Sequence, residues 1–589
     1  MRFQDIKEKL HLPEWAEITS SQFSDISFSC IKYAKLSKTD PLKVAEETAK
    51  EIKSEYVKKA VALNGYVNID LDFDELEKQE KILSKIALKN TNNSFSGKTI
   101  RLEHTSVNPN KALHIGHMRN SYIGEFIRKS LLYSSANVIT SNFIEDTGAQ
   151  VADIIVGFKY LNKKIETDEK FDLYCSKIYK EVNEDYEKDK SLLEKRKEVL
   201  LKIEQGDEST LEFLDSIVNK VLLAQLSTLI RENIKYNLLD LERYILKEGI
   251  VKAALDKLMS EGIAKISENE KNKGCIVTNL EGNEVTLTRS DGTSLYIAKD
   301  IAYAMIKHSI LKEKIKYKKF STNADGTDIL LSSNNGEEIG LQKIDVSFTL
   351  TDSAQNAEQQ AVKSIIERFS GKDSYNHYGY EPVAISNDTA SYLGIDTEEK
   401  FMRMSGRKGI TIEFDNLVDK VNSRVIEESS KNGRKMEESS ARQLASNVIR
   451  YYILRFSPSK MVIFDINDAT SLKGDSAVYI NYSYSRALSI LKKADKKSFK
   501  PAQFDGNETK FIKEIIFWEE ALDNAVSNLK PNLICEYLHR ISDAFNAFYE
   551  KNRIIGDERE ESRLVIVNAF KDIVENLSRF LGIELVEKI

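Results

Sequence analysis

The sequence predicts an α/β protein in three consecutive parts, with a parallel, nucleotide-binding type of sheet in the central part. An extended segment (99–105) leads into a loop and a helix, in which apolar residues recur at three-to-four spacing, and a second extended run covers 137–144. Strand, loop, helix and strand at this length form a parallel crossover unit. We place this unit in a domain at 98–415, between domains at 1–97 and 416–589.

Length and composition predict a globular, multidomain chain. With 589 residues it is too long for a single core, and 41% hydrophobic with 30% charged residues is typical of a soluble protein. The net charge of −6 means that any RNA-binding surface must be local. The four cysteines are far apart, so we expect neither a disulfide scaffold nor a zinc site, and no metal held by protein ligands. The sequence lacks a signal core and any run of about 18 apolar residues, which favours a cytoplasmic protein with no membrane partner.

The first domain reads as α+β. We expect a helix at 6–12, a strand near 25–30, helices from 41 to 63 and a strand at 66–71. Nothing in it looks catalytic.

The loop before the central helix carries His114-Ile115-Gly116-His117. A helix N-terminus offers unpaired N–H groups and partial positive charge, which suit a polyphosphate. Two imidazoles add N–H donors that can follow charge developing on a phosphate, and Gly116 leaves room for a purine against the backbone. The alternative for this short motif is a pair of loop histidines that bind neighbouring carbonyls.

The residues around this motif resemble a known family. Residues 103–111, Glu-His-Thr-Ser-Val-Asn-Pro-Asn-Lys, together with the following His-Ile-Gly-His, resemble the first signature of arginyl-tRNA synthetases of the archaeal and eukaryotic style, and 142–150 resembles their next block. The resemblance implies a class I Rossmann-like catalytic domain with a helical insertion at about 155–285. It also implies an N-terminal extension that contacts the tRNA corner and an all-α anticodon-binding domain at the C-terminus.

The stretch 288–303 contains a turn and then a helix that places Tyr296, Asp300 and Tyr303 on one face. A carboxylate one turn from a phenol can clamp a guanidinium group. The alternative is a surface carboxylate paired with Lys299 or Lys307. In the resemblance, Tyr296 and Asp300 hold the arginine side chain. The implied arginine site consists of Glu103, Asn108, Tyr296, Asp300 and Gln355.

A basic, glycine-flanked loop at 401–410 can close over a triphosphate and neutralise charge on pyrophosphate. It resembles the family's KMSKS loop, with Arg407 and Lys408 on the pyrophosphate side, while Lys111 can share that role from before the histidine motif. The implied catalytic residues are His114, His117, Lys111, Arg407 and Lys408. The implied ATP contacts are His114, Gly116, His117, Met404, Ser405 and Lys408.

One segment departs from the family pattern. Residues 310–345 are rich in lysine and then in glycine, asparagine and serine, and we expect an enlarged loop or short hairpin before a strand at 346–350.

The C-terminal third is predicted to be nearly all helical. Aromatic residues that alternate with polar ones offer stacking faces and phosphate partners for a single-stranded RNA loop. The candidates for tRNA contact are Tyr484, Arg486 and Asn546.

The resemblance implies an arginine–tRNA ligase that uses ATP with Mg²⁺, L-arginine and tRNA(Arg), and we expect a monomer. Two alternatives stay open. A cysteine-specific sister synthetase is disfavoured because the zinc cysteines are missing. An RNA-binding paralogue without catalysis is disfavoured by the intact His114, His117, Arg407 and Lys408.

Overall fold

The computed structural model describes residues 1–21, 23–88, 92–247, 249–280, 283–341, 343–395, 400–403, 412–431, 435–494 and 503–588. The chain separates into two compact units. One contains Met1–Lys89, Asn422–Arg455 and Asp468–Ile589, and the other contains Asn90–Val421 and Phe456–Asn467.

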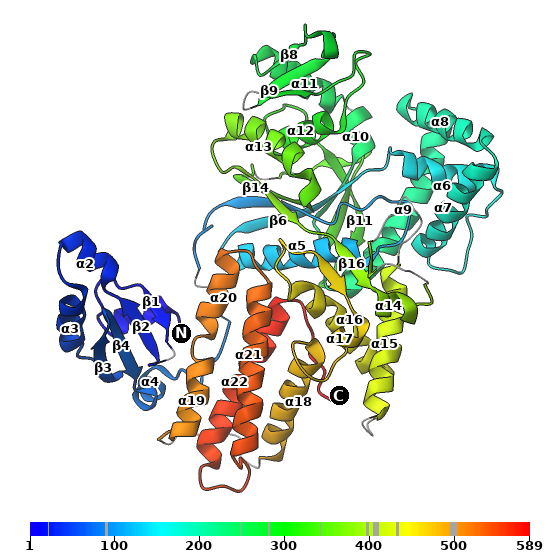
Figure 1. Ribbon diagram of the computed structural model, residues 1–589. Coiled ribbons are helices and arrows are strands. Elements are labelled where there is room, and N and C mark those ends of the chain that lie inside the picture. The colour runs from blue at the N-terminus through cyan, green and yellow to red at the C-terminus, as the bar shows by residue number, and fades with distance from the viewer. Residues whose placement is uncertain are drawn as a thin grey trace. The chain divides into compact units, whose positions relative to one another are not determined.

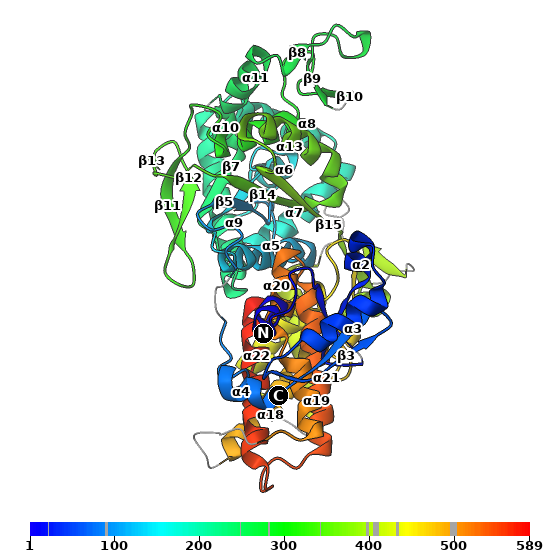
Figure 2. The ribbon, with the colours of Figure 1, turned by 90° about the vertical axis from the view of Figure 1, so that its left-hand side faces the viewer.

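The second unit is organised around an eight-stranded sheet (Figure 1, Figure 2). The strands in spatial order are β13 (Glu337–Glu338), β11 (Lys316–Thr322), β12 (Asp328–Ser332), β7 (Leu238–Leu241), β6 (Asn137–Ile144), β5 (Thr99–Glu103), β14 (Val346–Asp352) and β15 (Tyr375–Tyr380). From β12 to β15 all neighbours are parallel, whereas β11 runs antiparallel to both of its neighbours. Strands β5 and β6 flank helix α5 (Ile115–Tyr133), which confirms the predicted crossover unit.

Helices cover the sheet, and this explains why its central strands are largely buried. Every residue of β5 is buried, as expected for a parallel strand covered on both faces. Helices α12 (Tyr296–Lys307) and α13 (Asn356–Ser370) pack against each other. Their inner faces share one hydrophobic core, in which Ile301, Met305 and Ile365 are buried.

Helix α5 crosses the end of β5 at very close range. A Cβ atom added to Gly124 would lie 2.7 Å from the Cβ of His104, a distance that real side chains do not reach. The His104 ring is fully buried at this crossing. Glycine at position 124 is therefore required by the approach of the helix to the strand end.

The predicted insertion is helical first and mixed afterwards. Its helices are α6 (Ala149–Tyr160), α7 (Phe171–Lys188), α8 (Ser191–Glu204) and α9 (Glu208–Arg231). The chain then returns to the main sheet as β7. Beyond it lie α10 (Glu242–Lys247), α11 (Ile250–Ser260), η1 (Glu270–Asn272) and a small sheet of β8 (Ala264–Ile266), β9 (Ile276–Leu280) and β10 (Asn283–Thr286). Among the described helices, α9 alone is long and apolar enough to cross a membrane, but half of its most apolar window is buried within the protein.

A second small sheet joins the end of the main domain to a later segment. Strand β16 (Val383–Ser386) pairs with β17 (Phe401–Arg403) on one side and with β18 (Val462–Phe464) on the other. The remaining elements of this part of the chain are η2 (Ser353–Gln355), α14 (Asn387–Tyr392), α15 (Phe414–Lys431) and α17 (Ile466–Ala469).

The N-terminal part of the first unit is an antiparallel sheet with helices, as predicted. The strand order is β1 (Ile18–Ser20), β2 (Ile26–Ser29), β4 (Tyr66–Leu71) and β3 (Val57–Leu63), and the helices are α1 (Phe3–Lys9), α2 (Ile31–Ser37), α3 (Pro41–Glu51) and α4 (Phe73–Glu80). The prediction of helix up to residue 63 was wrong, because the chain turns back after α3 and β3 pairs with β4 along its length.

The rest of this unit is a helical bundle, which confirms the all-α prediction for this region (Figure 1). Its helices are α16 (Glu438–Leu454), α18 (Ala477–Lys493), α19 (Gly506–Ile515), α20 (Trp518–Ser527), α21 (Asn532–Lys551) and α22 (Glu560–Phe580).

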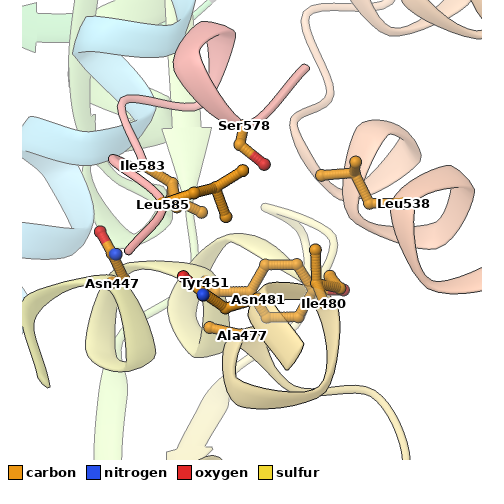
Figure 3. A pocket seen from close by; sticks show the side chains of 9 residues that line it. All are labelled: Asn447, Tyr451, Ala477, Ile480, Asn481, Leu538, Ser578, Ile583 and Leu585. Carbon is orange, nitrogen blue, oxygen red and sulfur yellow. The ribbon is translucent and has the colours of Figure 1, made fainter. Parts of the chain in front are cut away.

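Two asparagines hold the extended segment that follows α22. The Asn447 amide donates to the carbonyl of Glu584 (2.6 Å), and the Asn481 amide donates to that of Val586 (2.7 Å). Each amide oxygen accepts the N–H of the same residue in return. A small pocket lies under this segment, lined by Asn447, Tyr451, Ala477, Ile480, Asn481, Leu538, Ser578, Ile583 and Leu585 (Figure 3).

Candidate functional site

The first candidate site is the N-terminus of α5, at the carboxyl end of β5. His114 is the N-cap residue, and its Nδ1 accepts the backbone N–H groups of Gly116 (3.1 Å) and His117 (3.3 Å). In return, His117 Nδ1 accepts the N–H of His114 (3.2 Å). A Cβ on Gly116 would lie 3.0 Å from the His114 ring, so glycine lets this ring close over the helix end. The predicted start of the helix at the histidine motif is confirmed.

These hydrogen bonds also determine where the imidazole protons lie. Because both Nδ1 atoms accept backbone N–H groups, each neutral ring carries its proton on Nε2. The rings stack 3.5 Å apart with an interplanar angle of 19°. Burial, with the charge of Lys111 as a smaller cause, lowers the pKa of His114 to about 3, and burial also holds the pKa of His117 well below its ordinary value. The motif therefore presents two neutral Nε2–H donors.

Lys111 contacts the helical insertion. Its Nζ lies 3.4 Å from Oε1 of Gln150 and 5.5 Å from the centre of the Tyr179 ring, and burial lowers the pKa of its ammonium group. Gln225 of α9 donates to the Lys111 carbonyl (2.8 Å) and so fixes the backbone here. The cation is thus three residues from His114 in sequence, on a loop held by α9.

The chain on the C-terminal side of the predicted basic loop is tied to the histidine motif. The N–H of Phe414 donates to the carbonyl of Leu113 (2.7 Å), and Glu413 forms a β-bridge with His114. Asp415, which follows Phe414, accepts a hydrogen bond from Nζ of Lys170 (2.7 Å). The predicted ligands Met404, Ser405, Arg407 and Lys408 lie outside the described residues, and their roles stay predictions.

Arg119, one turn into α5, anchors the helix to two other segments. Its guanidinium group is fully buried and donates to the carbonyls of Pro382 (3.1 Å), Ser457 (3.2 Å), Pro458 (3.3 Å) and Lys460 (2.7 Å). Burial lowers its pKa to about 10. These carbonyls immediately precede β16 and β18, so α5 is fixed to the small sheet from which β17 and the basic loop continue.

The second candidate site is the acidic face of α12. Burial, and to a smaller extent the nearby carboxylates of Glu103, Glu145 and Glu358, raise the pKa of Asp300 to about 8. In the part of the chain that the structure describes, Asp300 forms no ion pair. A desolvated carboxyl group without an ion pair, under the influence of three further acids, is suited to a cationic ligand that brings its own donors.

The neighbouring lysines do not satisfy Asp300. Lys299 pairs with Glu242 (2.9 Å) and Lys307 pairs with Glu103 (2.5 Å). The alternative in which Asp300 is a surface carboxylate paired with one of these lysines is therefore wrong.

The other predicted arginine ligands are placed around this face. Asn108 lies close enough to Glu145 to lower the pKa of that carboxyl group, against the larger raising effect of burial. Glu103 is buried but already bound to Lys307. Tyr296, the first residue of α12, is 64% exposed and lies under the Lys299 ammonium (5.3 Å), and Gln355 is exposed at the N-cap of α13. The acidic residues Glu103 and Glu145 thus act on Asp300, whereas the side chains of Tyr296 and Gln355 are exposed to solvent.

Comparison with known proteins assigns the chain to a family. The model of the arginyl-tRNA synthetase N-terminal domain matches residues 4–71, that of the class I (R) tRNA synthetase catalytic domain matches 79–325, and that of the DALR anticodon-binding domain matches 480–589. The arginine–tRNA ligases of Pyrococcus furiosus and Archaeoglobus fulgidus are each 29% identical to this chain. These alignments cover 98% and 97% of the chain, and 97% and 96% of the two relatives. The chain belongs to the arginyl-tRNA synthetase family.

Solved structures agree with this assignment. The arginyl-tRNA synthetase of Thermus thermophilus superimposes with a TM-score of 0.84 and 26% identity over 99% of this chain and 98% of that one. The arginyl-tRNA synthetase of Plasmodium falciparum shares the fold, with a TM-score of 0.73 at 18% identity over 100% and 97% of the two chains. The predicted class I catalytic domain, N-terminal domain and all-α C-terminal domain are those of an arginyl-tRNA synthetase.

The predicted tRNA contacts of this synthetase divide into a buried residue and a surface pair. Tyr484 is 7% exposed, because its face of α18 packs into the bundle core, so its ring offers no stacking surface. Arg486 donates to Asn546 (2.7 Å), and its guanidinium group lies 4.7 Å and 4.6 Å from the rings of Tyr482 and Tyr549. The structure therefore brings Arg486 and Asn546 together but not Tyr484.

Sequence reasoning missed one buried group of this synthetase. Asp240 on β7 is bound by Arg101, Tyr303 and Tyr317, which come from a strand, a helix and a hairpin. No local motif marks these residues. Alternation of polar residues within otherwise apolar strands was the one available signal.

Proposed function

We propose that this enzyme ligates L-arginine to tRNA(Arg) in two steps. The arginine carboxylate attacks the α-phosphate of ATP, the bond to the β-phosphate oxygen breaks, and arginyl-adenylate and pyrophosphate form. A hydroxyl of the 3′-terminal adenosine of the tRNA then attacks the arginyl carbonyl, and AMP leaves. Positioning and charge stabilisation suffice for both steps, without a covalent enzyme intermediate.

The observation that carries this proposal is that Asp300 of α12 has no ion pair among the described residues. The loop that precedes α5 ends in His114 and His117, whose N–H groups can donate to phosphate oxygens. Asn108, in the loop from β5 to His114, influences the pKa of Glu145, and Glu145 in turn is one of the carboxylates that raise the pKa of Asp300. An amino acid with a cationic side chain can therefore place its guanidinium group on Asp300 while its carboxylate lies towards the N-terminus of α5. A neutral side chain would leave the buried acids without a partner, which costs binding free energy.

Each proposed residue has a role that follows from its chemistry. The Nε2–H groups of His114 and His117 donate to phosphate oxygens as charge develops on them. Lys111, Arg407 and Lys408 neutralise the departing pyrophosphate, and Met404 and Ser405 contact ATP. Asp300 binds the guanidinium group, with Tyr296 and Gln355 at the rim and Asn108 and Glu103 towards the α-amino group. Arg486 and Asn546 contact the tRNA.

Mg²⁺ is proposed as the companion of ATP. The described residues contain no group of three or more side chains that could hold a metal ion. Mg²⁺ usually retains waters and binds through substrate phosphates, where it offsets their negative charge. We further propose a cytoplasmic monomer with no membrane partner.

Aminoacylation of total tRNA with each of the twenty amino acids, ATP and Mg²⁺ tests this function. We expect charging of arginine alone, and loss of charging in Asp300→Ala. Asp256→Ala is the matched control, because Asp256 is an exposed acid that pairs with Lys252 on α11. Binding of tRNA without charging of any amino acid would instead support an RNA-binding paralogue, and charging of another amino acid would refute the role of Asp300.

A further inference from the structure

The segment that departs from the family pattern extends the main sheet. Residues 316–332 form the antiparallel pair β11 and β12, and β12 lies parallel to β7, with Leu330 and Leu331 opposite Leu238 and Leu239 (Figure 2). The Ser332 hydroxyl accepts the N–H of Leu241 (2.9 Å) and so fixes the register at the strand end. The expected short hairpin is thus an integral edge of the sheet rather than a surface loop.

This hairpin contributes one side chain to the interior. Tyr317 on β11 is 2% exposed, and its hydroxyl donates to Oδ1 of Asp240 (2.6 Å). Asp240 follows directly after the β7 residues that pair with β12. The hairpin therefore reaches past its neighbouring strand to a buried carboxylate.

The other oxygen of that carboxylate holds helix α12. Oδ2 of Asp240 accepts the Tyr303 hydroxyl (2.5 Å) and is paired with the Arg101 guanidinium group. Arg101 is itself fixed by Ser141 on β6 (3.2 Å). Among the described residues, Oδ1 has the Tyr317 hydroxyl as its donor, so loss of this hydroxyl would leave a buried oxygen without a partner, which costs free energy.

Helix α12 has a second buried anchor one turn further on. Lys307 pairs with Glu103 at the end of β5 and lies 4.3 Å over the Tyr303 ring. Asp300, Tyr303 and Lys307 have the spacing i, i+3 and i+7, which places them on one face of the helix. The contacts of Tyr303 and Lys307 thus determine where Asp300 stands over the sheet.

We propose that Tyr317 is a positioning residue for the arginine site. It completes the hydrogen bonds of Asp240, which holds Tyr303 and hence α12 and Asp300. This inference rests on the proposed role of Asp300 in binding arginine. Recognition of a guanidinium group by a carboxylate depends on orientation, and an error of about 1 Å in a binding group is enough to weaken a reaction strongly.

The test is steady-state aminoacylation by Tyr317→Phe, which removes the hydroxyl and keeps the ring. We expect the KM for arginine to rise by about three- to tenfold while the KM for ATP changes by less than about twofold. Tyr303→Phe removes the other tyrosine hydroxyl from Asp240 and should shift the KM for arginine in the same direction.

Tyr537→Phe is the matched control. Its side chain is also 2% exposed, and its hydroxyl donates to the carbonyls of Glu514 (3.1 Å) and Ile515 (3.3 Å) in the other unit of the molecule. It should lower thermal stability by a similar amount and leave both KM values unchanged. Unfolding curves for all three variants separate stability from positioning.

Two outcomes would overturn the inference. If Tyr317→Phe lowers only the melting temperature, as Tyr537→Phe does, the tyrosine is structural. If the KM values for arginine and ATP rise together, the hairpin supports the whole domain and not the arginine site. A wild-type enzyme that does not charge arginine would refute the proposed function itself, and this result is distinct from either of the others.

Discussion

The loop of His114 and His117 and the acidic face of α12 are both built to bind a charged ligand, but the ligands have opposite charge. In the loop, burial lowers the pKa of both imidazoles, so the rings are neutral donors that await a polyanion. On α12, burial and three nearby carboxylates raise the pKa of Asp300, so this acid is largely protonated near neutral pH and awaits a cation. Burial thus favours the neutral form of the side chains in both regions while no ligand is bound.

The difference lies in what the ligand must change. The histidines can donate from Nε2 without any change in protonation, because their tautomer is fixed by backbone N–H groups. Asp300 must lose a proton before it can pair with a guanidinium group. Binding of ATP can therefore be nearly independent of pH between 6 and 8, whereas binding of arginine should be coupled to proton release.

The largest effect is expected when the acidic site on α12 loses the charge of Asp300. Asp300→Asn retains the shape of the side chain but removes the charge, and kcat/KM for arginine should fall by about 10²- to 10³-fold. The KM for ATP should stay within about twofold of wild type. The measurement is aminoacylation at varied arginine and at varied ATP. An equal loss for both substrates would place Asp300 outside the arginine pocket.

The next effect separates the two functions of His114. His114→Ala removes both the cap and the Nε2–H donor, so we expect kcat to fall about 10²-fold and the free energy of unfolding to fall by about 1 kcal/mol. His114→Asn restores a good N-cap but no donor at the position of Nε2. It should recover the stability and not the rate, as measured by urea unfolding and single-turnover aminoacylation. Recovery of both would mean that His114 acts only as a cap.

A smaller effect concerns pH. The free enzyme holds Asp300 with a pKa of about 8, and arginine binds the ionised form, so the KM for arginine should fall about tenfold or more from pH 6 to pH 8 and then level off. The KM for ATP serves as the internal reference. Calorimetry in buffers of different ionisation enthalpy should show proton release on arginine binding at pH 7. Absence of proton release would show that the pocket binds arginine with Asp300 already ionised.

The smallest effect is on stability. Because folding raises the pKa of Asp300 above its ordinary value of 3.8, this group costs stability above that pH, and the cost grows until the pH reaches about 8. Asp300→Asn should therefore increase the free energy of unfolding more at pH 8 than at pH 5, because the cost of holding this group in the folded protein grows with pH over this range. Asp256→Asn, at an exposed position, should show no such difference. The measurement is urea unfolding at both pH values.

The sequence allowed the local parts of this molecule to be predicted. The unit β5–α5–β6, the start of α5 at the histidine motif and helix α12 each depend on patterns within single elements or between consecutive ones, and the structure has them as expected. The strand β3 was missed because its burial alternates weakly and pairing with β4 decides its conformation. Intrinsic propensity gives way to such pairing.

Contacts between distant segments could not be predicted in the same way. Asp240 gathers donors from positions 101, 303 and 317, and Arg119 binds carbonyls at 382 and 457–460. These residues are brought together by the order of strands in the sheet, which no single stretch of sequence contains. Tyr484 shows the converse case, since a tyrosine with polar neighbours in sequence lies inside the bundle.

The crossing of α5 over His104 has a consequence for how relatives of this protein can diverge. The side chain of His104 occupies the space that a side chain at position 124 would need. A small residue at position 104 would remove the ring but keep its Cβ, which would still lie 2.7 Å from a Cβ at position 124. Position 124 should therefore stay glycine in relatives that carry any side chain at 104 and keep the helix that presents His114 and His117 in this place.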